Sequence, residues 1–310
     1  MARDNGWRGR PARSALEWPG MRSHYAWLPP HADASTTGAH QVGVSFSAHT
    51  GQERRAGGRT VRGDIPPGTA FITGPEAISW LGVAEPTEAL EIYPDPGLLA
   101  GVGFDTGRPS IEPAAGVHDG VVFAVASLLK RAHVTGAELS DIEASTLSHR
   151  LVEHLGHVYP TGDRFGAAPA GTLGPATVDR IVQYVHAHLA GPITLDRLAA
   201  LATLSPYHFA RAFKSTTGMP PHRFVTTIRL ETAKVTLVSS RRPVTEVAHA
   251  VGFGNVSHFR RLFHREFGLR PSQLRPPHGR PQHGAAQHGA AQHRKNRPFP
   301  PAPGCVTVPR

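Results

Sequence analysis

Near the C-terminal end of the chain, apolar residues recur with the spacing of one face of a helix. Four positions follow the i, i+3, i+4, i+7 pattern: Val244, Val247, Ala248 and Val251. Gly252 follows, and glycine readily adopts the left-handed conformation that ends many helices. A second stripe then repeats every four residues, at Phe259, Phe263 and Phe267. The pattern predicts two short helices joined by a tight turn.

The second predicted helix has a basic outer face. Between its phenylalanines lie four basic side chains: Arg260, Arg261, His264 and Arg265. A short helix, a glycine-containing turn and a second helix with a basic face are typical of a helix-turn-helix unit.

A unit of the same design lies about 50 residues upstream. Thr194 is suited to cap its first helix, and Ser205-Pro206 opens its second helix with a serine cap and a proline in the first turn. Phe209 and Phe213 match the first two phenylalanines of the later unit, and Arg211 matches Arg261. The chain is therefore predicted to carry two helix-turn-helix units.

Residues 221–239 between the units predict one continuous connecting helix. Nineteen residues give roughly 28 Å of helix, comparable with the ~34 Å between successive major grooves on one face of DNA. Such a connector would hold two recognition helices about one turn of duplex apart.

The N-terminal half has a different pattern. Short β-like runs at 41–47, 69–73 and 89–93 alternate with glycine and proline turns, which predicts a small sandwich or barrel. Amphipathic helices are predicted at 118–133 and 138–159. These two helices would either cover their own domain or form a dimer seam.

The charge distribution supports this division. Of the net charge of +10, residues 172–278 contribute 14 basic against 5 acidic residues, and residues 23–171 contribute 9 against 16. An acidic middle followed by a basic C-terminal third is expected of a sensor joined to a nucleic-acid binder.

Five segments follow from these patterns. Residues 1–22 are expected to be disordered, with Met21 as an alternative start, and residues 23–160 to form a sensor or dimerisation domain. Residues 161–174 are predicted to form a linker, and residues 175–278 are predicted to form a DNA-binding domain. Residues 279–310 are expected to be a disordered, low-complexity tail.

The C-terminal motifs resemble the DNA-binding domain of the AraC/XylS family of bacterial transcriptional regulators. The matching segments are SPYHFARAFK from Ser205, GMPPHRF from Gly218, RLETAK from Arg229, VAHAVGF from Val247 and SHFRRLFHREFG from Ser257. The sequence departs from the family pattern at Arg270 and Leu274, where the family usually has Ser or Thr and an aromatic residue. The departure at these two positions affects the packing of the last turn of the domain.

The resemblance implies DNA-contacting residues in both units. By position, Tyr207 and Arg211 would meet bases from the first recognition helix, and Val256, Ser257, Arg260 and Arg261 from the second. Arg229, Lys214 and Arg265 are better suited to phosphate. The full expected set is Tyr207, His208, Arg211, Lys214, Arg229, Val256, Ser257, Arg260, Arg261 and Arg265.

The N-terminal half more weakly resembles the cupin-like sensor domains found in this family. The stretch PPGTAF from Pro66 is similar to a cupin turn, but Phe71 stands at the histidine position and Pro75 at the later asparagine position. A cupin metal site needs imidazole and carboxylate ligands, so no metal and no cofactor is expected. Phe71 and Trp80 are candidates to line an apolar effector pocket, with core packing as the alternative.

The composition and the remaining motifs argue against several other classes of protein and site. The single cysteine, Cys305, lies in the tail and supports neither a disulfide framework nor a repair nucleophile. No apolar run has the ~18 residues of a membrane span, and no signal peptide follows Met1, so a cytoplasmic, nucleoid-associated protein is expected. Ser127 and Lys130 match Ser-x-x-Lys without companion motifs, so no catalytic residue is expected. The spaced tail histidines between 283 and 293 are not expected to form a specific metal site.

The sequence thus predicts an α+β multidomain protein: a β-rich cupin-like domain with two trailing helices, followed by an all-α double helix-turn-helix domain. The expected function is a non-enzymatic, sequence-specific transcriptional regulator, an activator controlled by an unknown small effector or by homodimerisation. Its expected partners are double-stranded DNA, over two adjacent major grooves, and RNA polymerase. The alternatives are an effector-binding or enzymatic barrel with a vestigial DNA-binding module, and an alkyl-transfer repair protein.

Overall fold

A computed structural model of the chain describes residues 13–30, 34–38, 40–56, 58–74, 77–101, 111–160 and 171–274. The β-rich half comes first and the helical half follows, as predicted. Of the expected linker 161–174, residues 161–170 lie outside the described residues, as do the expected tail at 279–310 and Cys305. Within the described part of the linker, the Leu173 amide donates to Thr216 Oγ1 at 2.8 Å. No helix among the described residues has the length and apolar character needed to cross a membrane.

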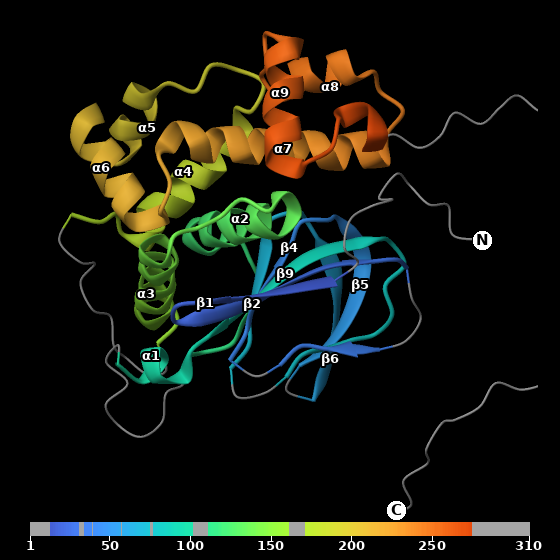
Figure 1. Cartoon of the computed structure of the whole chain (residues 1–310), viewed down its shortest axis with the longest axis vertical. Coiled ribbons are helices and arrows are strands. Elements are labelled where there is room, and N and C mark those ends of the chain that lie inside the picture. Colours follow the sequence, from blue (N-terminus) through green and yellow to red (C-terminus); the bar gives the residue numbers. More distant parts are fainter. Residues whose placement is uncertain are drawn as a thin grey trace, which may run out of the picture. The chain divides into compact units, whose positions relative to one another are not determined.

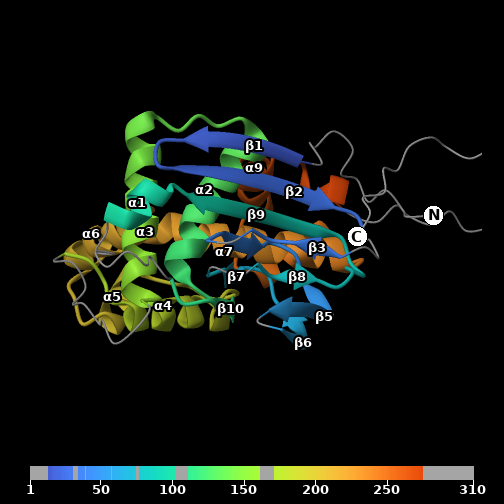
Figure 2. The ribbon, with the colours of Figure 1, turned by 90° about the horizontal axis from the view of Figure 1, so that it is seen from below.

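The β-rich half contains two antiparallel sheets (Figures 1 and 2). The larger has the order β1 (Arg13–Trp18), β2 (Met21–Leu28), β9 (Thr87–Pro94), β4 (Val42–Ser45), β7 (Thr69–Ile72) and β10 (Ala114–Val117). The smaller has the order β3 (Ser35–Thr36), β8 (Ser79–Trp80), β5 (His49–Ala56) and β6 (Arg59–Ile65). The predicted runs at 41–47, 69–73 and 89–93 correspond to β4, β7 and β9.

Strand β9 shows how the larger sheet separates two environments. Because successive side chains of a strand point to opposite faces, its buried residues Glu88, Leu90 and Ile92 face the helical layer. Thr87 and Glu91, on the other face, line a cavity between the sheets.

The expected disorder of residues 1–22 is wrong for residues 13–22. Residues 13–18 form β1, which pairs antiparallel with β2, and Met21 begins β2. Trp18 Nε1 donates to Ser23 Oγ at 2.7 Å, and Ser14 Oγ lies 2.7 Å from His133 Nδ1. These partners stabilise β1. Its own residues only alternate between exposed and half-buried positions. Residues 1–12 lie outside the described residues.

Helix α2 (Gly120–Thr135) lies between the larger sheet and the helical half (Figure 1). Asp119 caps it by accepting hydrogen bonds from the amides of Val121 and Val122 at 2.9 and 3.0 Å. Only Arg131, Val134 and Thr135 of its residues are not fully buried. Of the two roles predicted for this helix, it covers its own sheet, and its other face packs on the helical half. Short α1 (Pro96–Gly101) precedes it, and α3 (Asp141–Val158) follows, capped by Ser140 and Glu143.

The helical half consists of α4 (Pro175–Ala187), α5 (Leu195–Leu201), α6 (Pro206–Thr217), α7 (Pro221–Ser239), α8 (Val244–Ala250) and α9 (Val256–Phe267), followed by the 3-10 turn Pro271–Leu274. Helices α5 and α6 form the first predicted helix-turn-helix unit, and α8 and α9 form the second. Helix α7 has the bounds predicted for the connector. Its phenylalanine Phe224 belongs to the same apolar core as the larger sheet and α2.

Four buried charged side chains join the sheet, α2 and α7. Lys130 Nζ lies 2.7 Å from Glu231 Oε1 and 3.3 Å from Glu88 Oε1. Lys234 Nζ lies 2.6 Å from Glu231 Oε2 and also contacts Glu88. Tyr25 donates to Glu88 at 2.8 Å. Two cations and two anions thus compensate one another inside the protein, as buried charges require.

Candidate nucleic-acid interface and sensor cavity

Helix α6 separates an apolar face from a polar face in the way its sequence predicts. Ser205 accepts a hydrogen bond from the His208 amide at 3.4 Å and caps the helix. Phe209 and Phe213 are fully buried. The exposed face carries Tyr207, His208, Arg211 and Lys214. Tyr207 is 66% exposed, so its ring is accessible to a partner.

Two contacts order this exposed face. The Arg211 guanidinium lies over the Tyr207 ring, 5.8 Å from its centroid, with Nη1 at 3.4 Å from the hydroxyl. The ring nitrogen Nδ1 of His208 lies 2.7 Å from Ser205 Oγ. Tyr207 and Arg211 therefore present a flat aromatic and guanidinium surface together.

Helix α9 repeats the arrangement in the second unit. Asn255 Oδ1 accepts from the His258 amide at 3.0 Å and caps the helix. Phe259, Phe263 and Phe267 are buried. The exposed residues of its outer face are Ser257, His258, Arg260, Arg261, His264 and Arg265, with Val256 half-buried at its start. Arg261 Nη2 lies 2.9 Å from His258 Nδ1.

The cations of both outer faces are free to bind an anion. Among the described residues, no carboxylate lies within ion-pair distance of Arg211, Lys214, Arg260 or Arg261. Exposed cations without acidic partners are available for phosphate or base contacts.

Arg229 has a different environment from the other predicted contact residues. It is half-buried on α7, and its guanidinium donates to the carbonyl oxygens of Gly191 at 2.6 Å and Gly252 at 3.3 Å. Burial lowers its pKa. These contacts tie α7 to the segments before α5 and after α8, and a DNA contact by Arg229 stays a prediction.

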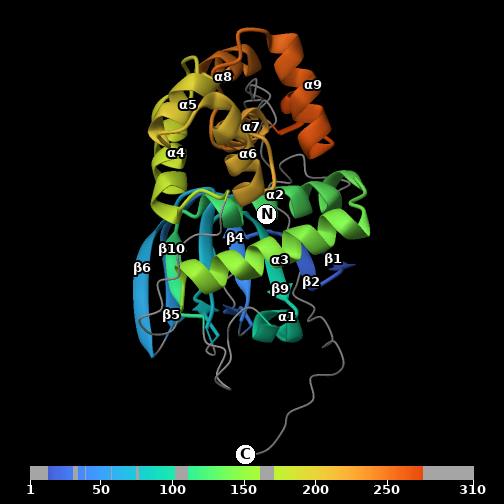
Figure 3. The same ribbon diagram turned by 90° about the vertical axis from the view of Figure 1, so that its left-hand side faces the viewer.

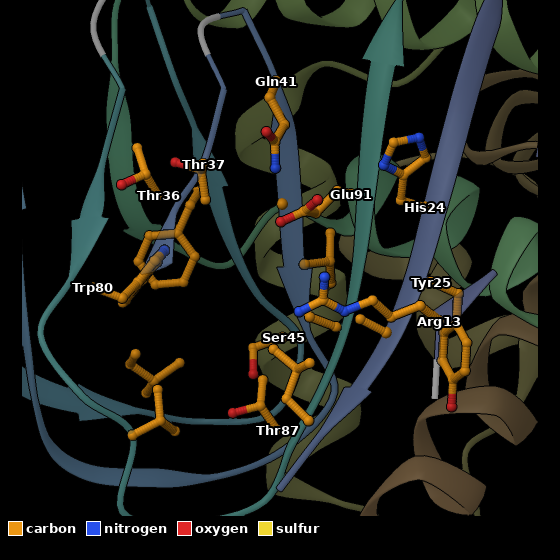
Figure 4. A pocket seen from close by; sticks show the side chains of 18 of the residues that line it. Arg13, His24, Tyr25, Thr36, Thr37, Gln41, Ser45, Trp80, Thr87 and Glu91 are labelled. Carbon is orange, nitrogen blue, oxygen red and sulfur yellow. The ribbon is translucent and has the colours of Figure 1, made fainter. Parts of the chain in front are cut away.

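A cavity of about 520 Å³ lies between the two sheets (Figure 4). Phe71 and Trp80, the two aromatic residues considered for an effector pocket, both line it and meet edge to face with centroids 4.8 Å apart. Ile65 and Val83 also belong to its wall. Its size suits a small organic molecule, since ligand sites commonly measure ~300–1,000 Å³.

Polar side chains also reach the cavity. Gln41 is 1% exposed, its Oε1 accepts from the Gly38 amide at 2.7 Å, and its Nε2 has no hydrogen-bond partner. Figure 4 shows the Gln41 amide and the Arg13 guanidinium pointing into the cavity, with Glu91 between them. Glu91 accepts from the Tyr93 hydroxyl at 3.0 Å. The sequence did not single out Arg13, Gln41 or Glu91, because separate strands bring them together.

Burial disfavours protonation of His49 in the cavity wall. His49 is 5% exposed, and burial lowers its pKa despite the opposing charge and hydrogen bond of Glu85. Its imidazole is therefore neutral at pH 7. Within the described ranges, no group of three or more His, Cys, Asp or Glu side chains is arranged to hold a metal ion.

Known proteins match the helical half. Residues 198–276 match the family model of a helix-turn-helix domain. Over 99 residues the chain is 36% identical to the MmsAB operon regulatory protein of Pseudomonas aeruginosa, covering 32% of each chain. Over 104 residues it is 34% identical to the transcriptional activator RhaS of Klebsiella pneumoniae, covering 34% of this chain and 37% of RhaS. A solved probable AraC family regulator from Rhodopseudomonas palustris is 31% identical, with a TM-score of 0.30 and coverage of 33% of this chain and 99% of that chain.

These matches define the class of the helical half. Residues 198–276 form a helix-turn-helix domain, which is the class that the sequence motifs predicted. The matched part of the regulatory proteins of P. aeruginosa and K. pneumoniae is about a third of their length.

Proposed function

We propose that the protein is a sequence-specific DNA-binding transcriptional regulator that places α6 and α9 in two adjacent major grooves. The observation that carries this proposal is the pair of capped helices with unpaired cations on their exposed faces. The nineteen-residue helix α7 connects the two units. A major groove about 12 Å wide admits one helix, and two such helices read more sequence than one.

In this proposal, equivalent residues of the two helices have equivalent roles. Arg211 and Arg261 read base edges, and Tyr207 packs on the first duplex segment beside Arg211. Val256, Ser257 and Arg260 meet bases in the second groove, while Lys214 and Arg265 bind phosphates. Supporting this division, all of these residues except half-buried Val256 are exposed.

We further propose that the β-rich half senses a small molecule in the cavity between its sheets. An aromatic body would pack on Phe71 and Trp80, and a hydrogen-bond-accepting head would meet Gln41 Nε2 and Arg13. Support comes from the unpartnered, buried Gln41 amide, since a buried donor without a partner costs about 1–3 kcal/mol. Binding of the small molecule in this cavity would then control the activation of transcription, through homodimerisation or through contact with RNA polymerase.

The alternative, an enzymatic barrel with a vestigial DNA-binding module, has less support. A vestigial module would have no reason to keep cations free of acidic partners on both recognition helices. The cavity holds neutral His49 and a Glu91 engaged by Tyr93, an arrangement without an evident nucleophile.

DNA selection with the purified protein, followed by binding to the selected duplex across salt concentrations, tests the regulator proposal. Arg211→Ala and Arg261→Ala should each weaken specific binding by about 1–3 kcal/mol and relax preference at one position. Arg59→Ala, an exposed arginine on β6, is the control. A wild-type protein that prefers no site over random duplex contradicts the proposal.

Tryptophan fluorescence tests the cavity. Phenylacetamide and phenylacetate present acceptor heads on a benzyl body, and phenethylamine presents a cation on the same body. Phenylacetamide and phenylacetate should change the fluorescence in a saturable way. Gln41→Leu should weaken the binding of both compounds, and Trp80→Phe should reduce the fluorescence change. Equal responses to all three compounds, or none, would count against this cavity as the sensor site.

A further inference from the structure

A second hollow, of about 700 Å³, lies between α3 of the β-rich half and α6 of the first helix-turn-helix unit. Figure 3 shows α3 passing beneath the lower end of α6. Five cationic residues line it: Arg131 on α2, Arg150 on α3, Arg211 and Lys214 on α6, and Arg223 on α7. Two acidic residues, Glu138 and Glu143, also line it. Five cations against two anions leave this groove with a formal charge of +3.

The cations from the β-rich half are held at the groove by the fold. Arg150 Nε donates to the carbonyl oxygen of Ser215 at 2.6 Å, which fixes its guanidinium against the end of α6. Arg131 has a buried Nε without a hydrogen-bond partner. Both residues lie outside the matched domain at 198–276, and neither was predicted to contact DNA.

Like charges crowd one another in this region. Burial lowers the pKa of Arg223, and Arg131 and Arg265 lower it further, against Glu266 and Glu143, which raise it. Arginine remains charged at pH 7, so the repulsion is present in the folded protein. A polyanion in the groove would relieve it.

The position of the groove identifies the polyanion. Arg211 and Lys214 belong both to its wall and to the exposed face of recognition helix α6. A helix inserted in a major groove has a phosphate backbone on each side, because the groove is only ~12 Å wide. The backbone on the α3 side of α6 would therefore run along this hollow.

We propose that the groove between α3 and α6 receives one DNA backbone and that Arg150 and Arg131 bind its phosphates. The β-rich half thereby contributes directly to DNA affinity through its α2–α3 hairpin. This inference rests on the proposed DNA-binding function. It adds contacts to phosphates, which set affinity and register without reading sequence.

Salt-dependent binding to the selected duplex tests the inference with the full-length protein. Each lost phosphate contact reduces the slope of log K against log salt by ~0.9, which corresponds to about eightfold weaker binding at 0.1 M salt. Arg150→Gln and Arg131→Gln should each show this loss equally on specific and random duplexes. Arg150→Lys keeps the charge and should retain the slope. Arg59→Gln on β6 is the remote control.

Three results would overturn the inference. An unchanged salt slope in both glutamine variants, with wild-type unfolding curves, means that these arginines do not meet phosphate. Tighter binding by Glu143→Gln together with unchanged slopes in the arginine variants means that the hairpin instead obstructs DNA. Loss of specificity without loss of slope means a positioning effect on α6. Failure of the wild type to prefer any duplex is a separate result, because it removes the proposed function itself.

Discussion

His133 lies inside the protein with both ring nitrogens near serine hydroxyls. Nδ1 is 2.7 Å from Ser14 Oγ and Nε2 is 2.8 Å from Ser23 Oγ. Burial, with a smaller contribution from His24, lowers the pKa of His133 to about 4. The sequence predicted a helix at this position but not the histidine's environment, because Ser14 and Ser23 lie more than 100 residues away.

The lowered pKa of His133 predicts a loss of stability in mild acid. In the unfolded chain a histidine binds a proton near pH 6.5, whereas folded His133 does so only near pH 4. Between these values the unfolded state binds more protons, so the free energy of unfolding decreases as the pH falls from 6.5 to 4, by about 1–3 kcal/mol. Urea unfolding of wild type and His133→Gln at several pH values measures this. If the variant keeps the wild-type pH dependence, His133 is not responsible.

Gly252 predicts a second single-residue effect. Its φ is +86°, and an added Cβ would lie 2.2 Å from the Leu189 carbonyl oxygen and 2.8 Å from Arg229 Cζ. Gly252→Ala should therefore lower the free energy of unfolding by about 2–4 kcal/mol. Gly254→Ala, where a Cβ meets nothing within 4 Å, should change it little. Equal unfolding curves for the two variants would contradict this account.

Among the elements, helices with local start and stop signals were the most predictable. Helix α6 has a serine cap, a proline in its first turn and a terminal glycine, and α7 begins at a proline. These signals lie within the helices or beside them, so the sequence alone located both. Strand β1 was not predicted, because its stability depends on pairing with β2 and on His133 of α2. The placement of α2 between two layers also depends on distant segments, although its amphipathic pattern was visible.

The ion cluster joining β9, α2 and α7 predicts strong coupling between substitutions. Lys130→Met leaves an excess buried negative charge and Glu231→Gln an excess positive charge, and each should cost about 3–5 kcal/mol of stability. The double variant leaves the Glu88–Lys234 pair balanced. Its cost should be at least about 2 kcal/mol smaller than the sum of the two. Urea unfolding of the four proteins measures the difference, and strict additivity would show that the charges act independently.

For the whole molecule, the sequence identified the helix-turn-helix class of the helical half but not how the two halves are joined. The basic faces of α6 and α9 were predicted because their residues lie on short, periodic segments. The sequence offered only Phe71 and Trp80 for the cavity and nothing for the groove between α3 and α6, since each requires residues from several distant elements. The packing of α2 on α4 is equally non-local: a Cβ on Gly120 would lie 2.7 Å from Val178 Cγ1 and 2.8 Å from Val182 Cγ2.

This shared packing predicts that the β-rich and helical halves unfold together. Trp18, Trp27 and Trp80 lie on strands β1, β2 and β8, so tryptophan fluorescence mainly follows the β-rich half. Helical circular dichroism mainly follows the rest. The two signals should have the same urea midpoint. Gly120→Val should lower both midpoints together, because it separates α2 from α4, whereas Gly63→Val, with no atom within 4 Å of its Cβ, should leave them unchanged. Two separate transitions, with only one affected by Gly120→Val, would mean that α2 does not couple the halves. A ligand in the sheet cavity would then need another route to α6 and α9.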